Sequence, residues 1–147
     1  MGTRCLTVVR EKEKSRDIIV MYRQYDGYPE GHGKELADFL ADFTVVNGIS
    51  TNTPKRSANG MGCLAAQIVA HFKTEIGNFY LHSSGTRDCG EEFIYTIYQK
   101  DGNLMLKVQA GAVTYFGMSG THQDDMKSLY HGPISQFSPD KLQTAAP

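Results

Sequence analysis

Hydrophobic and polar positions alternate with a period of two near the start of the chain, as is typical of β-strands. Residues 4–10 form a short β-branched run, and residues 17–25 place Ile19, Met21 and Arg23 on one side of a second run. The charged segment 11–16 separates the two runs, so they are predicted to pair as an antiparallel hairpin. The second run becomes polar and aromatic toward its end, which is typical of a strand that leads into a site.

Two later segments have helical periodicity instead. Apolar side chains recur at i, i+3, i+4 and i+7 in one of them, and these are Leu36, Phe39, Leu40 and Phe43. Residues 61–75 predict a second helix, which contains several alanines and is expected to end at Gly77-Asn78. The polar, turn-rich residues 47–60 between the two helices are predicted to be a surface loop.

The strongest hairpin pattern of the sequence surrounds residues 100–103, Lys-Asp-Gly-Asn. Residues 92–99 and 104–109 flank this turn and alternate, so that one apolar set faces the other: Phe93, Tyr95 and Ile97 against Leu104, Leu106 and Val108. Residues 79–82 are predicted to form a short strand and residues 83–90 a loop. After the hairpin, residues 112–116 predict one more strand and residues 122–130 a short helix.

Strands at both ends of the sequence with helices between them predict an α+β fold. We expect a single domain whose mainly antiparallel sheet carries two principal helices on one face. Residues 1–116 would form the core domain. The polar residues 117–147 would form a C-terminal extension that packs on the core or trails from it.

Composition limits the classes of function. The chain has 147 residues and a net charge of −1, from 15 basic and 16 acidic side chains. This balance argues against an extended nucleic-acid interface, although it leaves room for a local basic patch. The cysteines Cys5, Cys63 and Cys89 form no CxxC pair, and the sequence lacks a signal peptide and a membrane-spanning run. We therefore expect a cytoplasmic protein without a membrane association.

The densest candidate for a binding site is the segment 22–33, which contains several tyrosines and glycines. Gly31 and Gly33 directly precede the first predicted helix, where unpaired backbone N–H groups favour phosphate or carboxylate. The tyrosines offer stacking faces, and Arg23 offers a bidentate fork for an anion. A strand-to-helix connection that needs glycine and proline for its turn explains the same residues equally well.

A second candidate block is the loop 83–92, which concentrates hydroxyls, carboxylates and Arg87. Arg87 either binds a polar ligand or pairs with Asp88 or Asp26, and the sequence leaves both alternatives open. Together, the two blocks and the N-terminus give a predicted set of ligand-binding residues: Arg4, Arg23, Tyr25, Asp26, Tyr28, Gly31, His32, Gly33 and Arg87.

An enzyme is the alternative hypothesis, and it has less support from the sequence. Its candidate acid and base groups are Asp26, His32, Asp88 and Glu92, and Cys89 is a candidate nucleophile with His32 or His82. The histidines are scattered, and no HExxH, P-loop, GxSxG or GxGxxG motif is present. We therefore expect no metal site and no cofactor.

Several of these motifs together resemble a family of small uncharacterised proteins from bacteria and their phages, whose members begin MGTR and carry a DGYPxGxG signature. Here Met1–Arg4 and Asp26–Gly33 match those motifs, and the segments 60–67 and 85–92 are similar to later blocks of the family. The likeness runs from residue 1 to about residue 111. It implies a cytoplasmic, often phage-borne accessory protein, and it implies no particular activity.

These observations lead to three hypotheses about function. The first is a non-enzymatic protein that binds a small phosphorylated or nucleotide-like ligand, which in a phage setting would sequester a host nucleotide signal. The second is a metal-dependent or acid/base hydrolase or nuclease acting on a phosphorylated substrate. The third is an inhibitor that binds a host protein through an exposed edge of the final hairpin. A homo-oligomer is compatible with each hypothesis.

Overall fold

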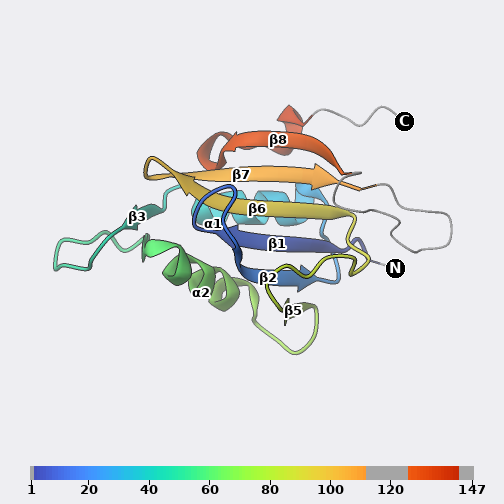
Figure 1. The fold of residues 1–147 in the computed structure, drawn as a ribbon, viewed down its shortest axis with the longest axis horizontal. Coiled ribbons are helices and arrows are strands. Elements are labelled where there is room, and N and C mark those ends of the chain that lie inside the picture. The colour runs from blue at the N-terminus through green and yellow to red at the C-terminus, as the bar shows by residue number, and fades with distance from the viewer. Residues whose placement is uncertain (1, 112–125, 143–147) are drawn as a thin grey trace.

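The computed structural model describes residues 2–111 and 126–142, and within these residues six strands form one mixed sheet (Figure 1). The strand order is β5-β2-β1-β6-β7-β8. The central strands β1 and β6 are parallel, and every other neighbouring pair is antiparallel. The strands span β1 (Cys5–Arg10), β2 (Asp17–Arg23), β5 (Phe79–His82), β6 (Phe93–Lys100), β7 (Asn103–Ala110) and β8 (Lys127–Pro133).

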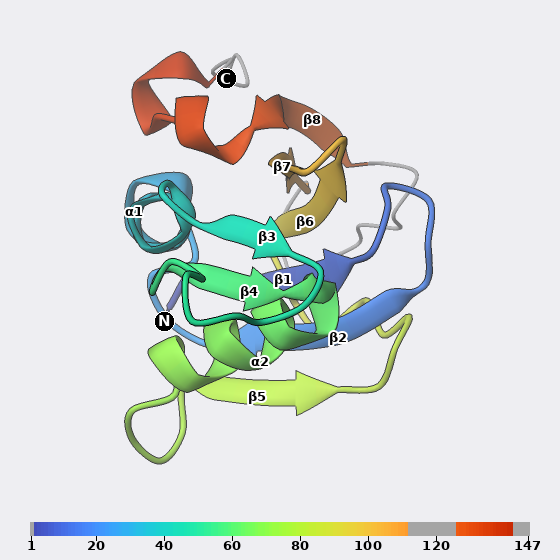
Figure 2. The same cartoon turned by 90° about the vertical axis from the view of Figure 1, so that its left-hand side faces the viewer.

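The helices lie together on one face of this sheet, as Figure 2 shows. They are α1 (Lys34–Leu40), which follows a π-helical turn, η1 (Pro29–Gly33), and α2 (Gly60–Phe72). Side chains of both helices join alternate residues of the central strands in the main hydrophobic core, among them Leu36, Leu64, Tyr95 and Leu106. The predicted α+β class, with two helices on one face of the sheet, is therefore confirmed.

The predicted hairpins are also confirmed. β1 and β2 pair antiparallel, as do β6 and β7, where Tyr95 lies opposite Val108 and Ile97 opposite Leu106. Asp101 and Gly102 form the turn with φ values of 52° and 83°. Positive φ at both central residues is the conformation that matches the twist of paired strands, and it explains why Asp-Gly was a strong hairpin signal.

The segment between the helices differs from the prediction. Residues 47–60 were expected to form only a loop, but β4 (Ser57–Asn59) pairs with β3 (Thr44–Val46) as a small parallel ladder. Helix α2 ends at Phe72, not near residue 75, because Lys73 adopts an extended conformation. The ammonium group of Lys73 donates to the carbonyl oxygens of Gly77 and Phe79, which holds the chain in this reversal.

The C-terminal part of the chain belongs to the sheet. Residues 127–130, expected to be helical, form the first part of β8, which pairs with β7. Ile134 and Phe137, in and beside the 3-10 turn η3 (Ile134–Gln136), are buried in the main core. The described part of segment 117–147 is thus integrated into the domain. The strand predicted at residues 112–116 lies outside the described residues, as do residues 122–125 of the predicted helix.

The final hairpin was expected to have an exposed edge, but the edge strands of the sheet are β5 and β8. β7 has β6 and β8 as neighbours, so neither strand of the final hairpin is an edge strand, and the inhibitor hypothesis loses its expected surface. β5 is an edge strand, but the outward-facing N–H of Phe79 donates to the carbonyl oxygen of Gly77. The Phe79 carbonyl accepts from Lys73, so the edge is partly blocked against strand addition.

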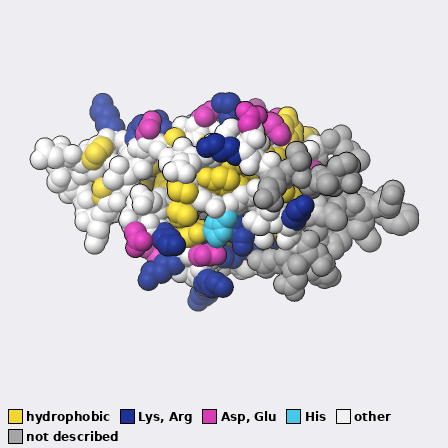
Figure 3. Space-filling model, turned by 90° about the horizontal axis from the view of Figure 1, so that it is seen from above, with side chains coloured by type: hydrophobic (Ala, Val, Ile, Leu, Met, Phe, Trp, Pro, Cys, Tyr) yellow, Lys and Arg dark blue, Asp and Glu magenta, His cyan; other side chains and the backbone are white. Residues whose placement is uncertain are grey.

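The second face of the sheet carries no helix among the described residues and is called the open face here. The loop between β5 and β6, residues 83–92, crosses this face, and Cys89 packs there against the cluster of Leu6, Val8 and Ile94. Figure 3 views the molecule from above, over the β8 side of the sheet, and shows basic and acidic side chains interspersed there. None of the described helices has the length and apolar character needed to cross a bilayer.

Candidate functional site

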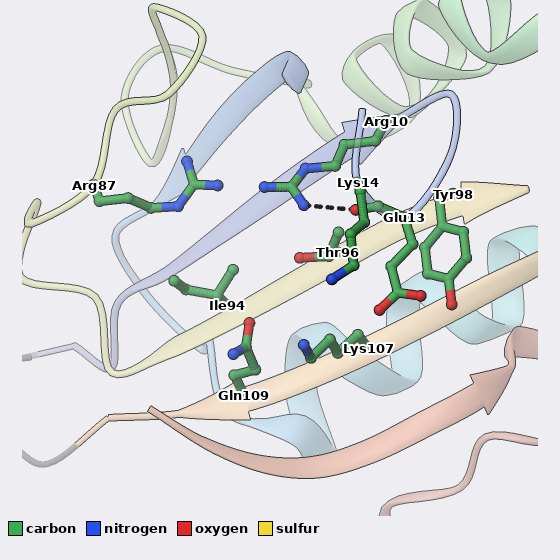
Figure 4. A pocket seen from close by; sticks show the side chains of 9 residues that line it. All are labelled: Arg10, Glu13, Lys14, Arg87, Ile94, Thr96, Tyr98, Lys107 and Gln109. Atoms are coloured by element: carbon green, nitrogen blue, oxygen red, sulfur yellow. Dashed lines mark hydrogen bonds between the residues drawn. The ribbon is translucent and has the colours of Figure 1, made fainter. Parts of the chain in front are cut away.

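The open face contains a hollow of about 230 Å³ over β6 and β7, shown in Figure 4. It lies between the β1–β2 turn and the loop that crosses this face. The side chains that line it come from three strands and both loops: Arg10, Glu13, Lys14, Arg87, Ile94, Thr96, Tyr98, Lys107 and Gln109. Most of these side chains are polar, and the described set includes four basic residues and one acidic residue.

Strand alternation explains why polar residues gather here. In β7, Leu106 and Val108 point into the main core, so Lys107 and Gln109 point to the open face. In β6, the same alternation buries Tyr95 in the main core and turns Thr96 toward the hollow. The floor of the hollow is therefore a direct product of the period-two pattern.

Asp17 at the start of β2 positions the two arginines of the hollow. Its side chain is only 3% exposed, and its carboxylate accepts from Arg10 Nε at 2.8 Å and from Arg87 Nη1 at 2.9 Å. The backbone N–H of Gly85 donates to the same carboxylate at 2.9 Å. Burial alone would raise the pKa of Asp17, but the hydrogen bonds from Arg87 and Arg10 outweigh it and lower the pKa. The ionised Asp17 thus fixes the crossing loop on the open face and orients both guanidinium groups.

The lysines supply the charge that is not neutralised. Lys14 comes from the β1–β2 turn and Lys107 from β7, and Figure 4 shows both side chains at the hollow beside Thr96 and Gln109. Within residues 2–111 and 126–142, neither lysine forms an ion pair. Four basic side chains therefore stand against two carboxylates, Asp17 and Glu13, and the site is positively charged in a chain of nearly neutral overall charge.

This set of donors suits a small oxyanion. Two ammonium groups, two oriented guanidinium groups, a hydroxyl and an amide match the several acceptor oxygens of a phosphoryl group. The volume is smaller than the roughly 300–1,000 Å³ of pockets that enclose drug-sized ligands. The hollow can therefore enclose a phosphate but not a whole dinucleotide.

The structure places two of the predicted site residues, Arg23 and His32, on the opposite, helix-covered side of the sheet. His32 in η1 is fully buried, and its Nε2 lies 2.6 Å from Thr7 Oγ1. Its Nδ1 lies 3.0 Å from Arg23 Nη1, which also donates to the carboxylate of Glu35. Since a guanidinium only donates, Nδ1 must accept, and the proton of the neutral ring sits on Nε2 and is donated to Thr7.

This tautomer opposes a catalytic role for His32. A general base for Thr7 would need an unprotonated Nε2, whereas here Nε2 carries the proton. Burial, together with the nearby charge of Arg23, lowers the pKa of His32 to about 3, so the ring stays neutral at physiological pH. The rings of Tyr95 and Phe72 pack against it with centroids 5.0 and 5.1 Å away. In this arrangement His32 holds η1 against the sheet.

The glycine-rich connection 26–33 packs against the protein itself. A Cβ on Gly27 would lie 2.8 Å from the carbonyl oxygen of Thr3, and one on Gly31 would lie 2.6 Å from that of Asp26. These close approaches, and not positive φ, require glycine at these two positions. Gly33 likewise lies against the rings of Tyr95 and Phe137. The structure thus supports the connection hypothesis for this segment.

The remaining predicted residues are dispersed. Tyr25, Asp26 and Tyr28 are exposed at the turn after β2, where the Tyr28 hydroxyl donates to Asp26 Oδ1 at 3.3 Å. Arg4 lies over Gly90 in the crossing loop. Arg87 pairs with Asp17, and not with Asp88 or Asp26. Of the predicted ligand-binding set, only Arg87 lines the hollow.

The candidate catalytic groups do not share an environment. Asp26 and Asp88 are exposed, whereas His32 is buried beneath the helices. Cys89 packs on the open face, so the sheet separates it from His32. Burial and the nearby carboxylates of Glu91 and Asp88 raise the pKa of Cys89, which disfavours the reactive thiolate.

Glu92 is half-buried where the crossing loop meets β6, and its backbone N–H donates to the carbonyl oxygen of Arg4. His82 is exposed on the edge strand, with its ring against Tyr22. Among the described residues, no group of three or more His, Cys, Asp or Glu side chains is placed to hold a metal ion.

The sequence patterns did not identify Arg10, Lys14 or Lys107 as site residues: Arg10 ends a predicted strand, and Lys14 lies in the charged segment 11–16. The alternation of residues 104–109 carried a usable signal, because it already placed Lys107 and Gln109 away from the core. No local pattern connects them with Arg87, which reaches the hollow only through the long crossing loop.

Comparisons of the chain with protein-family profiles, curated proteins and solved structures found no match.

Proposed function

We propose that this protein binds a small phosphorylated ligand at the hollow of the open face and releases it chemically unchanged. The observation that carries this proposal is the juxtaposition of Lys14 and Lys107, which form no ion pair among the described residues, with two arginines oriented by Asp17. Such a cluster costs stability through mutual repulsion unless an anion occupies it, and an oxyanion relieves this cost.

The groups around the hollow are suited to donate hydrogen bonds and not to carry out a chemical step. Burial, with a smaller contribution from the nearby Glu13, raises the pKa of the Tyr98 hydroxyl, which therefore stays protonated beside its hydrogen-bond partner His131 Nε2 at 2.6 Å. Arg10 and Arg87 are held by Asp17, and ordered donors of this kind bind an anion without prior rearrangement.

The size of the hollow defines how a larger ligand would bind. The hollow of about 230 Å³ holds a phosphate, and the rest of a larger ligand would extend along the open face outside it. A nucleotide signal of the kind sequestered in the phage setting would therefore be recognised through its phosphate. Its base would contribute less to the affinity than the phosphate does.

Isothermal titration calorimetry of the full chain with inorganic phosphate, AMP and a cyclic dinucleotide tests the proposal. Replacing Lys14 and Lys107 together by alanine should weaken binding at least tenfold, because charge-assisted hydrogen bonds are lost. The matched control is the double variant Lys55→Ala, Lys100→Ala, which removes the same charge from exposed positions outside the hollow and should stay within twofold of wild type. An absence of heat with all three ligands, or equal losses in both variants, would refute the proposal.

A further inference from the structure

A second hollow lies on the other side of the sheet, beside the buried Arg23. Its volume is about 300 Å³, and its walls are Arg23, Glu35, His71, Phe72, Thr74, Asn78 and Phe79. It is separate from the hollow of the open face, and it shares no lining residue with it. One end is charged and another is aromatic, so its chemistry differs from that of the phosphate site.

The charged end is an arginine that the protein has almost removed from water. The side chain of Arg23 is 8% exposed, and its guanidinium stacks over the Phe79 ring at 5.0 Å from the centroid. Its Nε is buried and has no hydrogen-bond partner within the described residues. A buried guanidinium with an unused donor retains a strong preference for an anionic partner.

That partner is at present Glu35, which is held much less firmly than Arg23. The Glu35 side chain is 49% exposed, and Arg23 is the only cation with which it pairs among the described residues. Its carboxylate can therefore turn to solvent when another anion takes its place on Arg23, which His32 and Phe79 hold in position. Glu35 thus occupies the position that the carboxylate of a ligand would take.

The remaining walls indicate what else the ligand carries. Phe72 and Phe79 provide apolar ring surface within reach of Arg23. Asn78 accepts from the backbone N–H of Tyr25 through Oδ1. Among the described residues its amide N–H groups have no partner, so they can donate toward an anion. A flat apolar body with one carboxylate satisfies both features.

We propose that this hollow is a binding site for a small aromatic carboxylic acid, whose carboxylate replaces Glu35 on Arg23 and whose ring packs against Phe72 and Phe79. A planar carboxylate matches the guanidinium fork, and one anion balances the one cation. Glu35 then acts as a built-in competitor that sets the affinity of the site.

Benzoate is a suitable probe, titrated into the full chain and followed by calorimetry and by the side-chain NH₂ signals of Asn78 in nitrogen-15 NMR spectra. Glu35→Gln should increase the benzoate affinity about tenfold or more, because the competing carboxylate is gone while an amide of the same size remains. Glu30→Gln, an exposed carboxylate in η1 outside the hollow, is the matched control and should change the affinity less than twofold.

Two further results decide the proposal. Benzoate should shift the Asn78 signals in Glu35→Gln, and the paired replacement of Lys14 and Lys107 should leave benzoate binding unchanged, which separates this site from the phosphate site. Equal affinities of wild type and Glu35→Gln, equal gains in both glutamine variants, or an Asn78 signal that does not move would overturn it. A folded Glu35→Gln, verified by its dispersed spectrum, keeps each of these outcomes interpretable.

Discussion

The two faces of the sheet each join a carboxylate to arginine, but they bury opposite partners. On the open face the buried group is the acid, Asp17, and the more exposed groups are Arg10 and Arg87. On the helix-covered side the buried group is Arg23, and the exposed one is Glu35. The first arrangement presents positive charge to solvent, and the second presents negative charge.

We infer from this difference that the exposed member of an ion pair determines which charge the site presents to a ligand. A buried acid that orients partly buried arginines at the rim of a hollow produces a site ready for an anion. A buried arginine paired with an exposed carboxylate produces a site that an anion can occupy only by displacing that carboxylate. Changes at Asp17, at His32 beside the buried Arg23 and at Glu35 test this difference.

The largest effect is expected for the buried acid. Asp17→Asn should destabilise the fold by about 3–5 kcal/mol, because it leaves two guanidinium groups without their shared counter-charge. Urea unfolding gives this value directly, and Asp38→Asn, in an exposed pair with Lys34, provides the control at under about 1 kcal/mol. A loss for Asp17→Asn no greater than that of the control would mean that Asp17 does not organise the open face.

The next effect concerns the neutral histidine on the helix side. The pKa of His32 falls from about 6.5 in the unfolded chain to about 3 in the fold, so the unfolded chain binds more protons between these values. Stability is therefore lost as the pH falls below about 6.5, by about 2 kcal/mol between pH 7 and pH 5. Urea unfolding at both pH values should show this loss in wild type and a correspondingly flatter dependence in His32→Gln.

His82→Gln serves as the control for that experiment, because it removes an exposed imidazole from the edge strand. This variant shows how the pH dependence of stability changes when a histidine that is not buried is removed. Should His32→Gln lose as much stability between pH 7 and pH 5 as wild type does, the neutral buried ring would not be the source of the acid sensitivity.

The smallest effect is expected for the exposed acid of the helix side. Glu35→Gln should cost about 1–2 kcal/mol, less than Asp17→Asn, because the amide oxygen still accepts from Arg23 and the guanidinium keeps its contacts with His32 and Phe79. Urea unfolding of Glu35→Gln and Asp17→Asn under the same conditions ranks the two losses in the free energy of unfolding. A cost equal to that of Asp17→Asn would show that Glu35 is a fixed part of the fold and not a displaceable partner.

Much of the fold was predictable because it follows from local patterns. Alternation located both hairpins, and helical spacing located α1 and α2. The β3–β4 ladder and β8 were missed because short strands take their stability from neighbours that are distant in sequence. The end of α2 depends on Lys73 reaching Gly77 and Phe79, a contact that helix propensity does not encode.

The site was less predictable than the fold, for a physical reason. A glycine-rich connection that cradles a ligand and one that packs against its own backbone have the same composition, and only the contacts of Gly27 and Gly31 distinguish them. The charge of Arg87 was identified, but its partner Asp17 lies far away in sequence. Lys14 and Lys107 can be identified as site residues only from the fold, which brings the β1–β2 turn and β7 together at one hollow.

The most direct test of the central claim is an NMR titration of the isotope-labelled full chain with inorganic phosphate. We predict saturable chemical-shift changes on the open face, at the backbone amides of Lys14, Thr96, Lys107 and Gln109. His32, beneath the helices, should show no comparable change. Phosphate that shifts none of the open-face amides, or that shifts the residues around Arg23 and Glu35 instead, would contradict it.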